Sequence, residues 1–141
     1  MSRIFFDTNL FIYLLEDAEA LGAKVANLLG RMSARNDELL TSTLTLGEVI
    51  VKPLRLGDNS TVTAYEAMLS TPGISLISLD KTAARIYGSL RRDKSLNTAD
   101  AIQLSCAAAS RCDLFVTNDD RLSKRIVPGI HFISSLDSAP I

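Results

Sequence analysis

The stretch Ile4-Phe5-Phe6-Asp7-Thr8-Asn9 sets the fold, because an apolar run ends there in a carboxylate and a helix-forming segment follows at once. Residues 3–6 have the composition of a short buried strand. Residues 9–16 are apolar nearly all round, which is typical of a helix packed close to a core. In a chain that alternates strands and helices, Asp7 then lies at the carboxyl end of the first strand, the edge where open parallel sheets bind ligands. We predict that Asp7 is the first of several acids that meet there.

The rest of the chain repeats this alternation. Apolar or alternating runs predict further strands at 38–41, 74–78, 114–117 and 130–133. Helical periodicity predicts helices at 18–35 with Asp17 as its cap, at 42–51 with an interruption near Pro53, and at 60–70, 80–93 and 97–110. We therefore predict a single domain over residues 1–141, with an α/β fold of three layers, α/β/α, and a central, mainly parallel five-stranded sheet.

The composition is that of a soluble globular protein, with 47% hydrophobic residues, 22% charged residues and a net charge of −1. A nucleic-acid partner would therefore not be held by a bulk basic surface. Two local clusters are either solvated helix faces or anion-binding patches: Arg91, Arg92 and Lys94, and Arg121, Lys124 and Arg125.

The remaining composition excludes several kinds of site and compartment. The two cysteines, Cys106 and Cys112, fit no zinc or redox spacing and favour a reduced, cytoplasmic setting. We expect no signal peptide and no membrane span. The only histidine, His131, is predicted to be an ordinary strand residue, so catalysis by Ser-His-Asp or Cys-His groups has little support.

Four acids are predicted to meet at one edge of the sheet: Asp7, Glu48, Asp100 and Asp119. Each also has a simple local explanation as a helix cap, a capping-box residue or a turn residue. Taken together they would repel one another, by ~4 kcal/mol for one pair ~4 Å apart at an effective dielectric constant of ~20. Such a cluster needs protons or cations to neutralise it, and a site with only oxygen ligands suits Mg²⁺ or Mn²⁺.

An acidic Mg²⁺ site favours hydrolysis of a phosphodiester. A haloacid-dehalogenase-type phosphatase would need a second aspartate at position 9, where this chain has Asn9. A phosphate-accepting signalling domain would need paired acids before Asp7, and Arg3-Ile4-Phe5 does not supply them. Neither a Walker A motif nor GxGxxG occurs, so these nucleotide-binding devices have no support.

At these residues the chain resembles the PIN-domain ribonucleases, and among them the VapC-like toxins of type II toxin–antitoxin systems. The resemblance is carried by four segments: Phe6-Asp7-Thr8-Asn9-Leu10-Phe11-Ile12-Tyr13, Ser42-Thr43-Leu44-Thr45-Leu46-Gly47-Glu48-Val49, Leu96-Asn97-Thr98-Ala99-Asp100-Ala101-Ile102-Gln103-Leu104 and Leu114-Phe115-Val116-Thr117-Asn118-Asp119. It implies a single PIN domain in which the four acids bind metal and act in catalysis. It also implies that Asn9 and Thr117 orient an acid or a water, and that Asp120 substitutes for Asp119 or assists it.

The resemblance further implies a Mg²⁺- or Mn²⁺-dependent endoribonuclease that cuts RNA, with transfer RNA as one candidate substrate. A metal-activated water would attack the phosphate in line. The implied partners are a cognate antitoxin and a second copy of the chain in a homodimer. Two alternatives stay open, a non-catalytic PIN-fold binding or regulatory module and a stand-alone RNA-processing nuclease. The apolar stretches Leu21–Met32 and Leu44–Leu56 either belong to the core or supply a partner surface.

Overall fold

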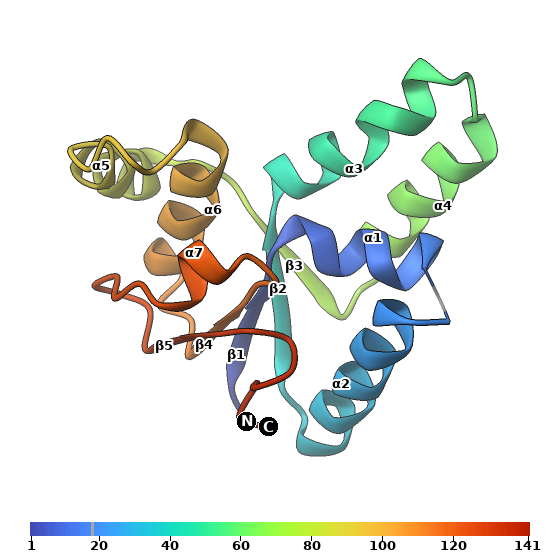
Figure 1. Ribbon diagram of the computed structural model, residues 1–141, viewed down its shortest axis with the longest axis horizontal. Coiled ribbons are helices and arrows are strands. Elements are labelled where there is room, and N and C mark those ends of the chain that lie inside the picture. The colour runs from blue at the N-terminus through green and yellow to red at the C-terminus, as the bar shows by residue number, and fades with distance from the viewer. Residues whose placement is uncertain (18) are drawn as a thin grey trace.

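The computed structural model describes residues 1–17 and 19–141. Over those residues it has a parallel five-stranded sheet in the order β3-β2-β1-β4-β5 (Figure 1). The strands are β1 (Arg3–Phe6), β2 (Glu38–Ser42), β3 (Ile74–Ile77), β4 (Leu114–Val116) and β5 (Phe132–Ser134). The predicted five-stranded sheet is confirmed, and it is parallel throughout. Since β1 is the central strand, Asp7, the residue directly after it, lies at the middle of the sheet edge.

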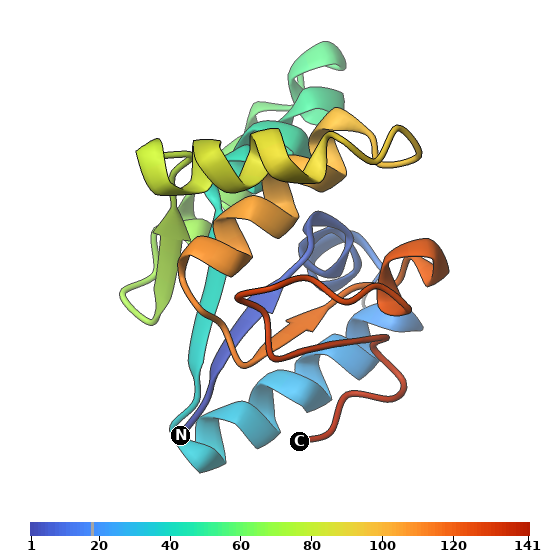
Figure 2. The same ribbon diagram turned by 90° about the vertical axis from the view of Figure 1, so that its left-hand side faces the viewer.

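Helices connect the strands and cover both faces of the sheet (Figures 1 and 2). They are α1 (Thr8–Glu16), α2 (Leu21–Arg35), α3 (Thr43–Arg55), α4 (Asn59–Leu69), α5 (Lys81–Leu90), α6 (Thr98–Ala109) and the short α7 (Asp120–Ser123). In Figure 2, α5 and α6 cross in front of the strands. Both termini lie at the end of the sheet opposite to the end of β1 that leads into α1.

Two hydrophobic cores occupy the two faces because strand side chains alternate. Phe5 and Phe115 stack with their ring centroids 5.2 Å apart and belong to the core beneath α5 and α6. Ile4 and Phe6 point to the other face, into the core formed with α1, α2 and the inner sides of α3 and α4. This arrangement confirms the predicted three layers.

The two apolar stretches with alternative assignments divide between core and surface. In α2, the side chains of Val25, Leu28 and Met32 are buried in the core. At the end of α3, by contrast, Leu54 and Leu56 are 54% and 69% exposed. The first stretch is therefore chiefly core, whereas the second carries apolar side chains on the surface.

Two predictions about the helices differ from the structure. Asp17 does not cap α2: its backbone N–H bonds to Tyr13 O and ends α1, and α2 begins at Leu21 after an uncapped Ala20. Position 18, the predicted start of that helix, lies outside the described residues. Helix α3 continues through Pro53 to Arg55, because a proline so near the end of a helix breaks only one late hydrogen bond.

The last strand begins two residues later than predicted and ends one residue later. Strand β5 begins at Phe132, which pairs with Leu114, and Ile130 precedes it in a turn closed by its N–H to Val127 O. Ile130 is still buried, so its apolar character serves the core and not the strand. His131 is an exposed residue just before β5, so its predicted place within a strand was wrong. Among the described helices, none is long and apolar enough to cross a membrane.

Candidate active site

Asp7 sits between the ends of two neighbouring strands. It is the N-cap of α1, where its Oδ1 accepts from the Thr8 N–H at 2.9 Å. Its Oδ2 accepts from Thr117 Oγ1 at 2.8 Å, and Thr117 is fully buried directly after β4. The Asp7 N–H donates to Val116 O at 3.0 Å, which ties the two strand ends together. The Asp7 carboxylate thus caps α1, and hydrogen bonds to both of its oxygens fix its orientation.

A buried polar network, formed by Thr8, Ser42, Thr45 and Gln103, lies next to Asp7. Gln103 on α6 is 2% exposed, and its Nε2 lies 2.9 Å from Thr8 Oγ1, 2.8 Å from Thr45 Oγ1 and 3.4 Å from Asp7 Oδ1. Its Oε1 accepts from the Ser42 hydroxyl. Because buried polar groups are costly unless bonded, this network fixes the beginnings of α1, α3 and α6 relative to one another.

Glu48 is joined to the site through Thr8. Thr8 Oγ1 donates to Glu48 Oε1 at 2.6 Å, so the residue after Asp7 orients the carboxylate of α3. The capping role at the start of α3 belongs to Ser42, whose Oγ accepts from the Thr45 N–H at 3.3 Å. Glu48 therefore does not act as a capping-box residue, which was its alternative explanation.

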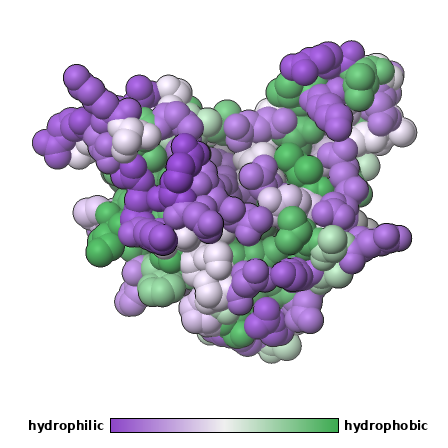
Figure 3. Space-filling view, in the orientation of Figure 1, coloured by the Kyte–Doolittle hydropathy of each residue, from purple (hydrophilic) through white to green (hydrophobic). Residues whose placement is uncertain are grey.

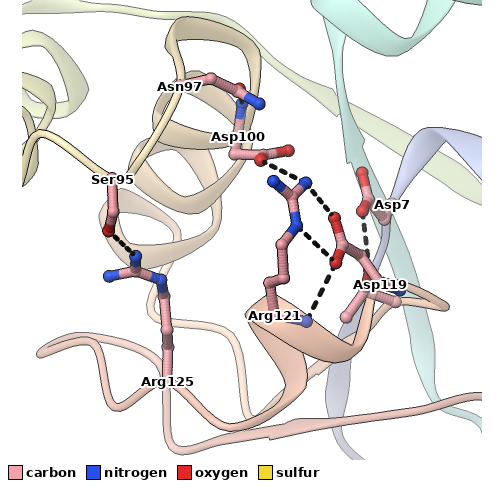
Figure 4. Close-up of polar contacts among 8 residues, drawn as sticks. Asp7, Ser95, Asn97, Asp100, Asp119, Arg121 and Arg125 are labelled. Carbon is pink, nitrogen blue, oxygen red and sulfur yellow. Dashed lines mark hydrogen bonds and ion pairs between the residues drawn. The ribbon is translucent and has the colours of Figure 1, made fainter.

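Asp100 and Asp119 share a cation, the guanidinium of Arg121 (Figure 4). Arg121 Nη2 lies 2.6 Å from Asp119 Oδ2 and 3.6 Å from Asp100 Oδ2, and Arg121 Nε lies 3.1 Å from Asp119 Oδ1. Asp100 occupies the first turn of α6, which Asn97 caps by accepting its N–H at 2.8 Å. Asp119 caps α7, and its own N–H donates to Thr117 Oγ1 at 3.1 Å. Thr117 therefore contacts Asp7 and Asp119 at once.

The electrostatics couple the four acids. Burial raises the pKa of Asp7, and the Glu48 carboxylate raises it further, against hydrogen bonds from Thr117, Thr8 and Gln103. Burial also raises the pKa of Asp100, and Asp7 and Asp119 add to that increase. Hydrogen bonds from Arg121 lower the pKa of Asp119. Asp7 is thus linked to Glu48 and Asp100, and Asp100 to Asp119.

The acids share one edge of the sheet without forming a closed metal cage. Within residues 1–17 and 19–141, no three His, Cys, Asp or Glu residues group closely enough to hold a metal ion as they stand. Their chemistry nevertheless fits a hard divalent cation, since the available ligands are carboxylate oxygens. The Arg121 guanidinium already stands between two of them as a positive counter-charge.

The three residues predicted to support the acids fall into different environments. Thr117 contacts Asp7 directly, as described above. Asn9, in the first turn of α1, and Asp120, the first residue of α7, both have exposed side chains. In the described part of the chain, neither has a side-chain hydrogen bond to any of the four acids.

Sequence reasoning missed Thr8, Thr45, Gln103 and Arg121 as parts of the site. Two of them carry a usable signal: Gln103 follows Asp100 by three residues and Thr45 precedes Glu48 by three. Residues at that spacing are neighbours on one helix face. In the sequence Arg121 is only one member of a basic cluster, and nothing local marks it as the partner of two acids.

Comparisons with known proteins identify the family and the fold. The model of the PIN domain family matches residues 4–126. A chain of the VapBC2 complex from Rickettsia felis, solved on a DNA fragment from its promoter, is 19% identical with a TM-score of 0.75, covering 94% of this chain and 98% of that one. A chain of a toxin–antitoxin complex from Klebsiella pneumoniae is 22% identical with a TM-score of 0.65, covering 90% and 94%.

A third solved structure is VapBC-5 from Mycobacterium tuberculosis, a member of the VapBC family of toxin–antitoxin systems. It is 19% identical with a TM-score of 0.63, covering 95% of this chain and 99% of that one. At these identities the likeness establishes the fold. No curated protein sequence matches the chain significantly. The family model extends over most of the chain and includes Asp7, Glu48, Asp100 and Asp119, and the chain therefore belongs to the PIN domain family.

Proposed function

We propose that the protein is a metal-dependent endoribonuclease that hydrolyses RNA phosphodiester bonds with Asp7, Glu48, Asp100 and Asp119. The observation that carries this proposal is the environment of Asp7. Its two oxygens are held by Thr8 and Thr117, and burial together with Glu48 raises its pKa. Perturbed carboxylates at the carboxyl edge of a parallel sheet are typical of functional sites.

Each side chain has a defined task in this proposal. Asp7, Glu48, Asp100 and Asp119 would hold Mg²⁺ or Mn²⁺, while Thr117 and Gln103 keep Asp7 in place and Thr8 keeps Glu48 in place. A divalent cation bound there would supply Lewis-acid chemistry, which makes water a stronger nucleophile at neutral pH and offsets phosphate charge. Asn9 and Asp120 remain candidates for contacts made only when a ligand is bound.

The surface around the acids suits a polymer. Figure 3 shows a broad notch between the α3–α4 side and the α5–α6 side, with hydrophilic residues gathered over the latter. Arg92, Lys94 and Lys124 have exposed side chains near this side, while Arg125 is engaged by Asp93 at 2.8 Å. We propose that the exposed cations bind the phosphates of RNA, transfer RNA being one candidate, on either side of the bond to be cut.

We further propose that the protein is the toxin of a toxin–antitoxin pair, that it acts in the cytoplasm, and that it forms a homodimer. The antitoxin proposal is supported by the solved relatives, all three of which are described as VapBC or toxin–antitoxin complexes.

Light scattering of the purified chain checks the dimer: a mass equal to one chain would contradict it. Co-purification with the product of an adjacent small gene tests the toxin proposal against a stand-alone nuclease.

The experiment that tests the nuclease is cleavage of total RNA or a transfer RNA pool by the purified protein with Mg²⁺ or Mn²⁺. The test variant is Asp7→Asn. Its matched control is Asp137→Asn, which removes an exposed carboxylate paired with Lys24. We expect discrete fragments from the wild type and Asp137→Asn, and none from Asp7→Asn or with EDTA.

Two results would contradict the proposal. Cleavage at the wild-type rate by Asp7→Asn would show that the acids are not the catalytic groups. A folded wild-type protein that binds Mn²⁺ but cuts neither RNA pool would favour the non-catalytic binding module.

A further inference from the structure

Arg121 occupies the position of a counter-ion inside the acidic site. Its guanidinium makes two hydrogen bonds to Asp119, from Nε at 3.1 Å and from Nη2 at 2.6 Å, and Nη2 also reaches Asp100 at 3.6 Å. Figure 4 shows it between these two carboxylates, on the side of Asp119 away from Asp7. These are the acids that the proposed function assigns to the metal.

We propose that Arg121 is an intramolecular competitor of the divalent cation, and that the cation binds by displacing its guanidinium from Asp119 and Asp100. This inference rests on the proposed function, because it concerns the same four acids. It accounts for the orientation of Asp119, which is turned toward Arg121 and uses both of its oxygens there.

The displacement is physically reasonable because the Arg121 side chain is exposed to solvent. Its side chain is 69% exposed, compared with 19% for Asp100 and 25% for Asp119. Solvent screens an ion pair that is this exposed, so a divalent charge can compete with the single guanidinium charge for the same carboxylates. Once released, Arg121 is a free cation at the edge of an acidic site, where it can bind an RNA phosphate bidentately. Metal binding would thus prepare the site for the anionic substrate.

Neighbouring Arg125 provides a matched control. It lies on the same segment and carries the same charge, but it is held by Asp93 at 2.8 Å and by Ser95 Oγ at 3.0 Å. Figure 4 shows its guanidinium beside Ser95, away from Asp7, Asp100 and Asp119. Removing either arginine makes the protein more negative by one charge. A difference between Arg121→Gln and Arg125→Gln therefore reports the specific contact and not the net charge.

The test is calorimetric titration of RNA-free protein with Mn²⁺, for the wild type, Arg121→Gln and Arg125→Gln, with circular dichroism to confirm that all three are folded. We expect Arg121→Gln to bind Mn²⁺ about fivefold or more tightly than the wild type, the lower end of typical coupling between sites. Arg125→Gln should stay within about twofold of the wild type, as expected for a distant, screened charge.

A second measurement follows the guanidinium itself. The Arg121 Nε–H gives a nitrogen-15 resonance that is identified by its absence from Arg121→Gln, and it should shift as Mg²⁺ saturates the protein. Arg121→Gln binding Mn²⁺ no more tightly than Arg125→Gln, or an Nε–H signal unchanged by saturating Mg²⁺, would overturn the competition while leaving the nuclease proposal standing. Absence of Mn²⁺ binding in all three proteins would overturn both.

Discussion

At the scale of single residues, Asp7 is held in an environment that disfavours its own charge. Burial and Glu48 raise its pKa above the ordinary value of 3.8, although Thr117 and Thr8 donate hydrogen bonds to it. The fold therefore favours the protonated acid, and its stabilising contribution is present at low pH and is lost as the pH rises through the folded-state pKa. Raised carboxylate pKa values are expected of a cation-binding site when no cation is bound.

This predicts how Asp7→Asn changes the pH dependence of stability. The free energy of unfolding of the wild type should fall relative to that of Asp7→Asn as the pH rises above the ordinary pKa of an aspartate, about 4, so the variant is the more stable protein at neutral pH. Urea denaturation of both proteins at a series of pH values measures the difference. Asp119 has a lowered pKa, so its contribution to stability changes with pH in the opposite direction. Both proteins contain Asp119, so this contribution cancels in the comparison. Parallel curves would contradict the prediction.

Thr117 is the residue that contacts two acids, and its hydroxyl should be needed for activity. Thr117→Val keeps the shape of the buried side chain but removes the donor to Asp7 and the acceptor of the Asp119 N–H. We expect cleavage of RNA to fall by about 10-fold or more, the usual effect of losing a group that orients a metal ligand. Thr117→Ser retains the hydroxyl and should stay near the wild-type rate. Equal rates for the two variants would show that the hydroxyl is dispensable.

At the scale of secondary structure, three helices begin at the site. Helices α1, α3 and α6 are capped by Asp7, Ser42 and Asn97, and each cap accepts an N–H of the first turn. The positive ends of the helix dipoles therefore face the acids and partly offset their mutual repulsion. Helix capping, which was the alternative explanation for Asp7, therefore occurs within the site itself.

The junction of α1 and α2 offers a test of packing. A Cβ at Gly22 would lie 2.3 Å from Tyr13 O and 2.4 Å from Asp17 O, both of them backbone atoms. Gly22→Ala should therefore lower the free energy of unfolding by roughly 1–3 kcal/mol, as overpacking usually does. Gly30 lies in the same helix, and a Cβ added there would have no atom within 4 Å, so Gly30→Ala should raise stability by about 0.5–1 kcal/mol. Urea denaturation of both variants measures this, and effects of the same sign would contradict it.

At the scale of the whole molecule, the site joins segments from both halves of the chain. Glu48 and Asp100 belong to helices on opposite faces of the sheet, and Asp7 and Asp119 to the exits of neighbouring strands. A cation bound by all of them would link both layers to the sheet and stabilise the native state by mass action.

We therefore expect Mn²⁺ to raise the melting temperature. A ligand at about 100 times its Kd stabilises by about 2.7 kcal/mol, which corresponds to a shift of several degrees for a domain of this size. Glu48→Gln should lose at least half of the shift, whereas Glu66→Gln, on the exposed side of α4, should keep it. A thermal melt with and without Mn²⁺ measures both variants. Equal shifts in the two would remove Glu48 from the proposed ligands.

The amino-acid sequence was sufficient to predict the five strands, every described helix except the short α7, and the edge of the sheet on which the four acids lie. Asp7 follows an apolar strand, and Asn97 stands three residues before Asp100. Both patterns involve residues that are close in sequence, so they can be recognised without knowledge of the fold. The same locality explains the errors. Whether Asp17 or Ala20 precedes α2, and whether Ile130 joins a strand, depends on packing that a local pattern does not contain.

How the acids are held, and by which groups, follows from the folded chain alone. Gln103 and Asp7 are 96 positions apart in sequence, and Thr117 and Asp7 are 110 apart, so their contacts exist only once parallel strands have been brought side by side. Arg121 is close to Asp119 in the chain, yet its reach to Asp100 depends on the orientation of α6 against α7. Hydrogen bonds and ion pairs act over a few ångströms, and it is the folded path of the chain that sets those distances.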